Sequence, residues 1–428
     1  MAIASIIAPA QMDHTKMLSS AVETDSRSIE DLNFRGGDAA MPPFSDSIVD
    51  VNSSFRTSLL SKGMALRDIS MVLYSQNTLA SPVAADSQSF VGQRPFQNLM
   101  SNPILTWDMR QLGLHHAQLN LSGVWNWVSW EPAGPKAFDL WTLYIYKEFL
   151  NDRIEVKAGY NSEELEFVGM QVGGATNSGV QGVYAVLPYE VGMAYFPMSA
   201  PMANLKLRGP DHLYIKSGLQ RSYDPKGGPE NERRNHTSLR FDPKGDKLLA
   251  IEEFGYQRPS SASSGEIWFR ANYLHNSTQY TNLENGKQQP GNHAAFALLD
   301  VQLRRPDPAK PYKGLYLGGS AMTAASQFNA FDRYYEARIY DMAPFAKRPG
   351  DVISLLSTYT GHSKYLTDAL VRQGKTVWRD GVSVTGTYNI HVARGNDLSL
   401  GLSYLRGPAI TPRVSAPLNF TAIYSVFF

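Results

Sequence analysis

Charged side chains of both signs recur two residues apart in this 428-residue chain. Arg153, Glu155 and Lys157 form the clearest run, and Asp108 and Arg110 form a pair with the same spacing. Because successive side chains of a β-strand point to opposite faces, residues two apart share one face. A face of this kind can brace a wall through internal ion pairs, or it can present hydrogen-bond donors and acceptors to a polar solute. The sequence leaves both roles open.

Later segments carry the same pattern, with apolar residues between the charged ones. Ala297, Leu299 and Val301 alternate with Asp300 and Gln302, for example. We expect the charged members to lie on the polar faces of their strands, where the further candidates are Arg270, Asp300, Arg304, Glu336 and Arg338.

These residues do not form a catalytic or metal-binding motif. The chain has no cysteine, and no Gly-x-Ser-x-Gly, His-Glu-x-x-His or phosphate-loop pattern occurs. His115, His116 and His391 lack partners at metal-ligand spacing. We therefore expect neither an enzyme nor a metal ion or other cofactor. Lys+Arg 40 against Asp+Glu 39 also gives no electrostatic case for a nucleic-acid partner.

The elements that must position the charged faces are predicted to be β-strands. Beyond residue 60, period-two segments of roughly ten residues alternate with turn sequences, and about sixteen such strands can be counted. Helical periodicity is nearly absent, with residues 54–64 as the best short candidate. No run of about 18 uncharged apolar residues occurs, so a transmembrane helix is excluded.

Two readings of an alternating sheet compete, a soluble sandwich and a transmembrane barrel. The mean hydropathy of −0.29 does not separate them, because lipid-facing and lumen-facing residues of a barrel also alternate. Charged residues make up only 18% of the chain, which is low for a soluble protein. Aromatic residues make up 11%, as the aromatic girdles at the two membrane interfaces of a barrel would require. Tight turns such as Asn151-Asp152 contrast with long polar loops such as 222–246 and 275–293. These features favour an all-β, transmembrane antiparallel β-barrel with short periplasmic turns and long extracellular loops.

The C-terminal sequence TAIYSVFF supports the barrel. Phe420, Ala422, Tyr424 and Phe428 fall on one face of a strand, which we expect to meet lipid. We therefore predict two parts, an N-terminal leader over residues 1–50 and a barrel over residues 51–428. The run MAIASIIAPA at the start resembles the end of a secretory signal, although an ordinary unstructured terminus reads the same way.

The adjacent pair Glu252 and Glu253 can place only one carboxylate inside such a barrel. With Leu249 and Ile251 taken as lipid-facing, strict alternation would put Glu253 toward lipid as well, which is costly near the midplane. We therefore expect Glu252 to face the lumen and Glu253 to lie near a rim.

From residue 55 onward the chain resembles the carbohydrate-selective porin family, often called OprB. The most specific segments are "YKEFLNDRIEVKAGYNSEELEF", "YFPMSAPMANLKLRGPDHLYIKSGLQRSYDP" and "APFAKRPGDVISL". The family's Trp-Gly pair is absent before "NSSFRTSLL", and "LSYLRGP" replaces a Gln-Tyr-containing stretch. The resemblance implies a bacterial outer-membrane channel that passes monosaccharides and related small polar solutes down their gradient.

Within this resemblance, the partners are small carbohydrate solutes and outer-membrane lipid. A homo-oligomer is possible, and the sequence does not distinguish a trimer from a monomer. Two other classes stay open: an outer-membrane barrel enzyme, and a soluble β-rich carbohydrate-binding protein. The expected pore-lining residues are Asp108, Arg110, Arg153, Glu155, Lys157, Glu252, Arg270, Asp300, Arg304, Glu336 and Arg338.

Overall fold

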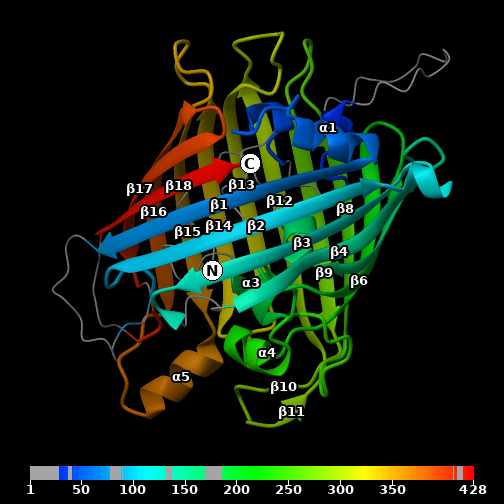
Figure 1. Cartoon of the computed structure of the whole chain (residues 1–428). Helices are drawn as coiled ribbons and strands as arrows, with labels where there is room; N and C mark the ends of the chain where they lie inside the picture. The colour runs from blue at the N-terminus through cyan, green and yellow to red at the C-terminus, as the bar shows by residue number, and fades with distance from the viewer. Residues whose placement is uncertain are drawn as a thin grey trace.

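The computed structural model is a closed antiparallel β-barrel (Figure 1), and it describes residues 28–36, 41–77, 88, 90–131, 137–168, 186–407, 409–411 and 418–428. Sixteen strands form the barrel, and a separate two-stranded hairpin, β10 and β11, lies in one loop. The barrel strands are β1 (Met64–Asn77), β2 (Phe96–Asp108), β3 (Ala117–Val128), β4 (Ala137–Phe149), β5 (Ile154–Asn161), β6 (Ala200–Arg208), β7 (Leu213–Arg221), β8 (Leu248–Arg258), β9 (Ile267–Asn276), β12 (Asn292–Arg304), β13 (Gly314–Ala324), β14 (Phe331–Met342), β15 (Val352–His362), β16 (Asp380–Ala393), β17 (Asn396–Arg406) and β18 (Leu418–Phe427).

The helices are short and belong to the segments that connect or precede the barrel strands. Residues 54–61 form a helix as predicted, and in the described part of the chain no helix is long and apolar enough to cross a membrane. The helices are α1 (Ser54–Ser61), α2 (Glu163–Phe167), α3 (Val186–Glu190), α4 (Gly228–Arg234) and α5 (Lys364–Arg372), and the hairpin strands are β10 (Tyr280–Thr281) and β11 (Gln288–Gln289).

The first and last strands close the barrel. β1 pairs antiparallel with β18 from Ile69–Phe427 to Asn77–Asn419. Tyr424 and Phe428 are 43% and 40% exposed, whereas Ser425 is 1% exposed. The prediction that Tyr424 and Phe428 face outward is therefore confirmed, while Phe427, on the other face, is 4% exposed.

Connections differ in length between the two rims. The periplasmic rim carries short links such as 150–153, 209–212 and 394–395, and the extracellular rim carries long ones such as 162–199 and 222–247. Figure 1 shows α4, α5 and the β10–β11 hairpin together at the extracellular end, with α1 at the opposite end.

The lumen contains two segments that pack on the inner wall. The N-terminal segment of residues 28–36 and 41–50 lies against β1–β4, where Thr106 and Gln118 bond the carbonyls of Leu32 and Asn33. The described ends of the 162–199 loop, which include α2 and α3, pack on the opposite wall. Their Phe167 and Leu187 join Leu249 and Ile251 of β8 in one buried apolar cluster. Apolar side chains therefore face inward as well as outward, and the lumen narrows where these segments lie.

Candidate functional site

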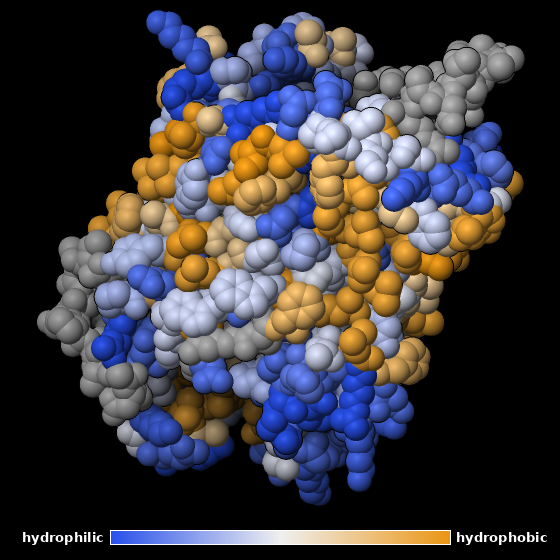
Figure 2. All heavy atoms as spheres, in the orientation of Figure 1, coloured by the Kyte–Doolittle hydropathy of each residue, from blue (hydrophilic) through white to orange (hydrophobic). Residues whose placement is uncertain are grey.

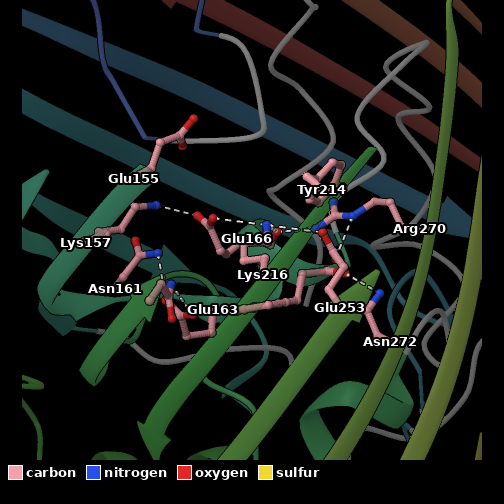
Figure 3. A network of polar contacts seen from close by, with 12 residues as sticks. Glu155, Lys157, Asn161, Glu163, Glu166, Tyr214, Lys216, Glu253, Arg270 and Asn272 are labelled. Carbon is pink, nitrogen blue, oxygen red and sulfur yellow. Dashed lines mark hydrogen bonds and ion pairs between the residues drawn. The ribbon is translucent and has the colours of Figure 1, made fainter. Parts of the chain in front are cut away.

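An ion-pair network joins the infolded loop to the barrel wall (Figure 3). We call it the loop-anchoring network, and its members are Lys157 of β5, Glu166 of α2, Lys216 of β7, Glu253 of β8 and Arg270 of β9. Each wall residue lies on an inward-facing position of its strand, so neighbouring strands bring the four side chains together.

Glu166 is the residue through which the loop is held. One oxygen of its carboxylate, Oε2, pairs with Lys157, and the other, Oε1, lies 3.2 Å from Nζ of Lys216. Its backbone carbonyl accepts hydrogen bonds from Lys216 at 2.8 Å and from Arg270. The wall therefore donates to both the side chain and the main chain of α2.

Glu253 completes the network on the wall. Arg270 approaches its carboxylate through Nε at 2.9 Å and Nη2 at 2.7 Å, and Lys216 lies 3.5 Å from its other oxygen. The side chains of Arg270 and Glu253 are 0% exposed, and that of Lys216 is 1% exposed. Pairing is what makes such burial tolerable, because an isolated buried charge is costly. The network is a brace sealed from the solvent.

Glu163 of α2 lies beside this network and binds the wall differently. Asn161 and Asn204 donate to its two carboxylate oxygens at 3.0 and 2.8 Å. Burial raises the pKa of Glu163 to about 7, and the neighbouring Glu166 carboxylate acts in the same direction. The charge of the α2 anchor therefore changes near neutral pH.

A second cluster of charges lies on the wall between β12 and β14. We call Asp300, Glu336 and Arg338 the β14 cluster. Arg338 forks onto Asp300 through Nε at 3.0 Å and Nη2 at 2.8 Å, and it also pairs with Glu336 and with the hydroxyl of Ser320. The side chain of Arg338 is 8% exposed and that of Glu336 is 5% exposed.

Hydroxyl groups line the wall next to the β14 cluster. Thr358 of β15 lies opposite Glu336 in the register, and its hydroxyl is 2.5 Å from that of Ser383 on β16. Thr385 donates to Ser403 on β17 at 2.8 Å. We call Thr358, Ser383, Thr385 and Ser403 the hydroxyl wall. A hydroxyl both donates and accepts. Thr385 and Ser403 are 0% and 1% exposed, whereas Thr358 and Ser383 keep 5% and 4% exposure, so the latter two are the members nearest to the open lumen.

The expected orientation of the adjacent glutamates is wrong. Glu253 faces the lumen, while Glu252 is exposed on the outer face, where Ser217 donates to it at 2.5 Å. Leu249 and Ile251 were taken as lipid-facing, but both point inward and are 0% exposed. The infolded loop packs its own apolar side chains on Leu249 and Ile251 from inside the barrel, so these two residues face the lumen and not the lipid.

Arg304 also departs from its expected place. A β-bulge between Gln302 and Arg304 shifts the register, so Arg304 lies opposite the outward-facing Leu315. An extra residue in one strand reverses the faces that follow it. Arg304 is 55% exposed and pairs with Asp341 at 2.7 Å on the outer side of the periplasmic rim.

The remaining predicted residues lie at the periplasmic mouth. Asp108 ends β2 and pairs with Arg110 at 3.0 Å, but Arg110 belongs to a 3-10 helix and not to the strand. Arg153 is exposed in the turn before β5, so it is not on the strand face where we expected it. Glu155 faces inward and accepts from Arg208 of β6 at 2.7 Å.

The residues that sequence reasoning placed correctly at inward positions of the wall are Asp108, Glu155, Lys157, Arg270, Asp300, Glu336 and Arg338. It missed Glu166 and Lys216. Lys216 shares its face of β7 with Tyr214 and Gly218 and alternates with Ile215 and Ser217, so the same period-two argument could have found it. Glu166 lies in a short helix of a loop, and no local pattern indicates that this loop folds into the barrel.

The fold and the charged, hydroxyl-rich inner wall define an outer-membrane porin. The sequence matches the carbohydrate-selective porin, OprB family over residues 129–418, which is more than half of the chain. The protein therefore belongs to this family, and the resemblance seen in the sequence is confirmed.

Solved structures give the same fold. The high-pH structure of Pseudomonas putida OprB aligns with a TM-score of 0.75 at 14% identity, covering 90% of this chain and 98% of that one. The low-pH structure of the same protein aligns over the same shares with a TM-score of 0.57. No curated protein sequence matches the chain. The protein is a carbohydrate porin of the bacterial outer membrane. The alternative of a soluble β-rich carbohydrate-binding protein is therefore wrong.

Proposed function

We propose that the channel passes monosaccharides such as glucose, and related small polar solutes, along the part of the inner wall where the β14 cluster and the hydroxyl wall lie side by side. The observation that carries the proposal is their adjacency: Glu336 of β14 pairs in register with Thr358 of β15. A sugar leaving water needs donors and acceptors close together, and weak multiple contacts let it leave again. All five N–H groups of Arg338 have acceptors on the wall, and in this proposal a sugar hydroxyl replaces the neutral ones, the Ser320 hydroxyl and the Leu299 carbonyl. The planar guanidinium then suits two neighbouring sugar hydroxyl groups.

Lys157 and Arg270 have a different role in this proposal. Both side chains donate to Glu166 of α2 and hold this helix in place, so in this proposal they shape the passage without contacting the solute. Asp300 similarly orients Arg338. Glu155, Asp108 and Arg110 lie at the periplasmic mouth, where they contribute to the field that a leaving solute meets.

We further propose that the protein has no catalytic activity and needs no cofactor. Family and fold are those of a channel, and in the described part of the chain no group of three or more His, Asp or Glu side chains could hold a metal ion. Residues 1–50 are proposed to act as a leader whose later part, from residue 28, packs in the lumen. A trimer and a monomer both remain compatible with this proposal.

Liposome swelling tests the proposal. Vesicles containing the protein should swell faster in glucose than in a charged solute of equal size, and a planar bilayer should show stable conductance steps that glucose blocks. Arg338→Lys keeps the charge but loses the planar fork, so we expect weaker glucose block with a similar conductance. Equal swelling in all solutes of one size would show a general porin instead.

A further inference from the structure

A pocket opens on the outer face of the barrel at the periplasmic rim, away from the lumen. It has a volume of about 350 Å³ and is lined by Val49, Phe55, Arg56, Leu66, Arg67, Asp68, Pro103 and Phe428. Leu66 and Phe428 belong to the lipid-facing side and are 37% and 40% exposed, and Phe55 of α1 is 54% exposed. α1 therefore makes one side of the pocket, and the closing strands make the other.

The outer face next to this pocket is unusually polar for a lipid-facing surface. Asp68 points outward on β1, and Ser70 and Ser101 donate to its carboxylate at 2.6 and 2.9 Å. Figure 2 shows orange, hydrophobic side chains around the middle of the barrel, with white and blue residues among them in this view. At the rim a carboxylate on the lipid-facing side costs little, and it can meet a cationic group of the membrane.

The pocket also contains a buried cation. Arg56 is 2% exposed, and its guanidinium donates to Ser47 through Nη2 at 2.6 Å. Its Nε and Nη1 atoms have no hydrogen-bond acceptor among the residues that the structure describes. Arg67, which is 6% exposed, also lines the pocket, so the lining combines apolar side chains, two buried positive charges and a partly exposed carboxylate.

We propose that this pocket binds a zwitterionic phospholipid of the periplasmic leaflet whose head carries a primary ammonium. The acyl chain fills the space among Phe55, Leu66 and Phe428, whose volume lies within the range of about 300–1,000 Å³ that is typical of small-molecule sites. The ammonium group meets Asp68, and the phosphate lies in the positive potential of Arg56. A lipid bound here would hold α1 against the seam where β1 meets β18.

Native mass spectrometry with phosphatidylethanolamine as the probe tests this proposal. We expect the folded barrel to retain one phosphatidylethanolamine in preference to phosphatidylglycerol. Leu66→Trp fills the pocket and should lower retention at least about ten-fold, and Asp68→Asn should lower it about five-fold, as loss of one ion pair permits. Val72→Trp is the matched control, because Val72 is 49% exposed on the same face of β1 and does not line the pocket.

Several outcomes would overturn the proposal. Equal retention by wild type and Leu66→Trp would show that the pocket is not the site, and equal binding of phosphatidylglycerol would remove the role of Asp68. A dimer mass that is lost in Leu66→Trp would show that a second copy of the chain fills the pocket. If Leu66→Trp fails to fold, Phe55→Ser removes the α1 side of the pocket without altering the barrel and should also lower retention.

Discussion

The loop-anchoring network and the β14 cluster use the same residue types on the same inner wall, but they hold different things. The network ties an infolded loop to three strands through Glu166, and its Arg270 is 0% exposed. The β14 cluster joins strands only, and its Arg338 is 8% exposed beside a wall of hydroxyl groups. Charges sealed under a loop position the passage, whereas charges left at its edge can meet a solute.

This comparison predicts that Arg270 and Arg338 fail in different ways when they are replaced. Arg270→Gln leaves Glu253 buried without its main cation, and breaking a buried pair costs about 3–5 kcal/mol. We expect a large drop in the thermal unfolding temperature in detergent. The double variant Arg270→Met, Glu253→Leu should recover much of it, because no charge is then left unpaired. A stable Arg270→Gln variant that loses glucose block would instead place Arg270 in the solute path.

The next largest effect concerns pH and the α2 anchor. The pKa of Glu163 is raised from 4.5 to about 7 by burial and by Glu166, so the folded protein binds more protons than the unfolded chain between these values. The contribution of Glu163 to stability is therefore present at low pH and lost as the pH rises through about 7. A shift of this size corresponds to on the order of 3 kcal/mol.

Glu163→Gln should flatten the dependence of the unfolding temperature on pH between about 4.5 and 7. Glu230→Gln is the control, since Glu230 lies on the exposed helix α4 and its pKa is lowered by its hydrogen bond and charge interaction with Arg233. An unchanged slope in Glu163→Gln would show that this carboxyl is ionised in the folded protein throughout the range.

Arg338→Gln is expected to affect transport as well as stability. It leaves the Asp300 carboxylate, whose side chain is 1% exposed, without its cation, and breaking a buried pair costs about 3–5 kcal/mol. The loss of a donor fork at the lumen edge should weaken glucose block about five-fold, as the loss of about 1 kcal/mol implies. Single-channel recordings with glucose measure this directly, with Arg338→Lys as the conservative variant. Wild-type glucose block in Arg338→Gln would make the β14 cluster a brace like the first network.

The sequence predicted the barrel well because a β-strand has a fixed side-chain period. The number of strands, the outward aromatic residues of β18 and the inward position of Arg338 all follow from alternation. Alternation could not predict what lies inside. Leu249 and Ile251 face inward only because residues of the 162–199 loop pack on them, and this contact between distant segments inverted the assignment of Glu252 and Glu253.

A bulge is the other feature that alternation misses. The three residues Asp300, Gln302 and Arg304 have equal spacing, yet the register shift after Gln302 separates Arg304 from the other two. No turn residue or glycine within the segment 300–304 marks the shift. Only the pairing with β13 defines it.

The smallest predicted effect tests that bulge. Arg304 is 55% exposed and pairs with Asp341 at 2.7 Å, and an exposed ion pair contributes only about 0–1 kcal/mol because water screens it. Arg304→Gln should therefore change the unfolding temperature little and leave glucose block at the wild-type level. Arg338→Gln, measured in the same recordings, provides the contrast between an outward and an inward arginine. If Arg304→Gln weakened glucose block as much as Arg338→Gln, Arg304 would have to reach the channel mouth. The bulge would then not turn its side chain away from the lumen, and strict alternation would be right at this position.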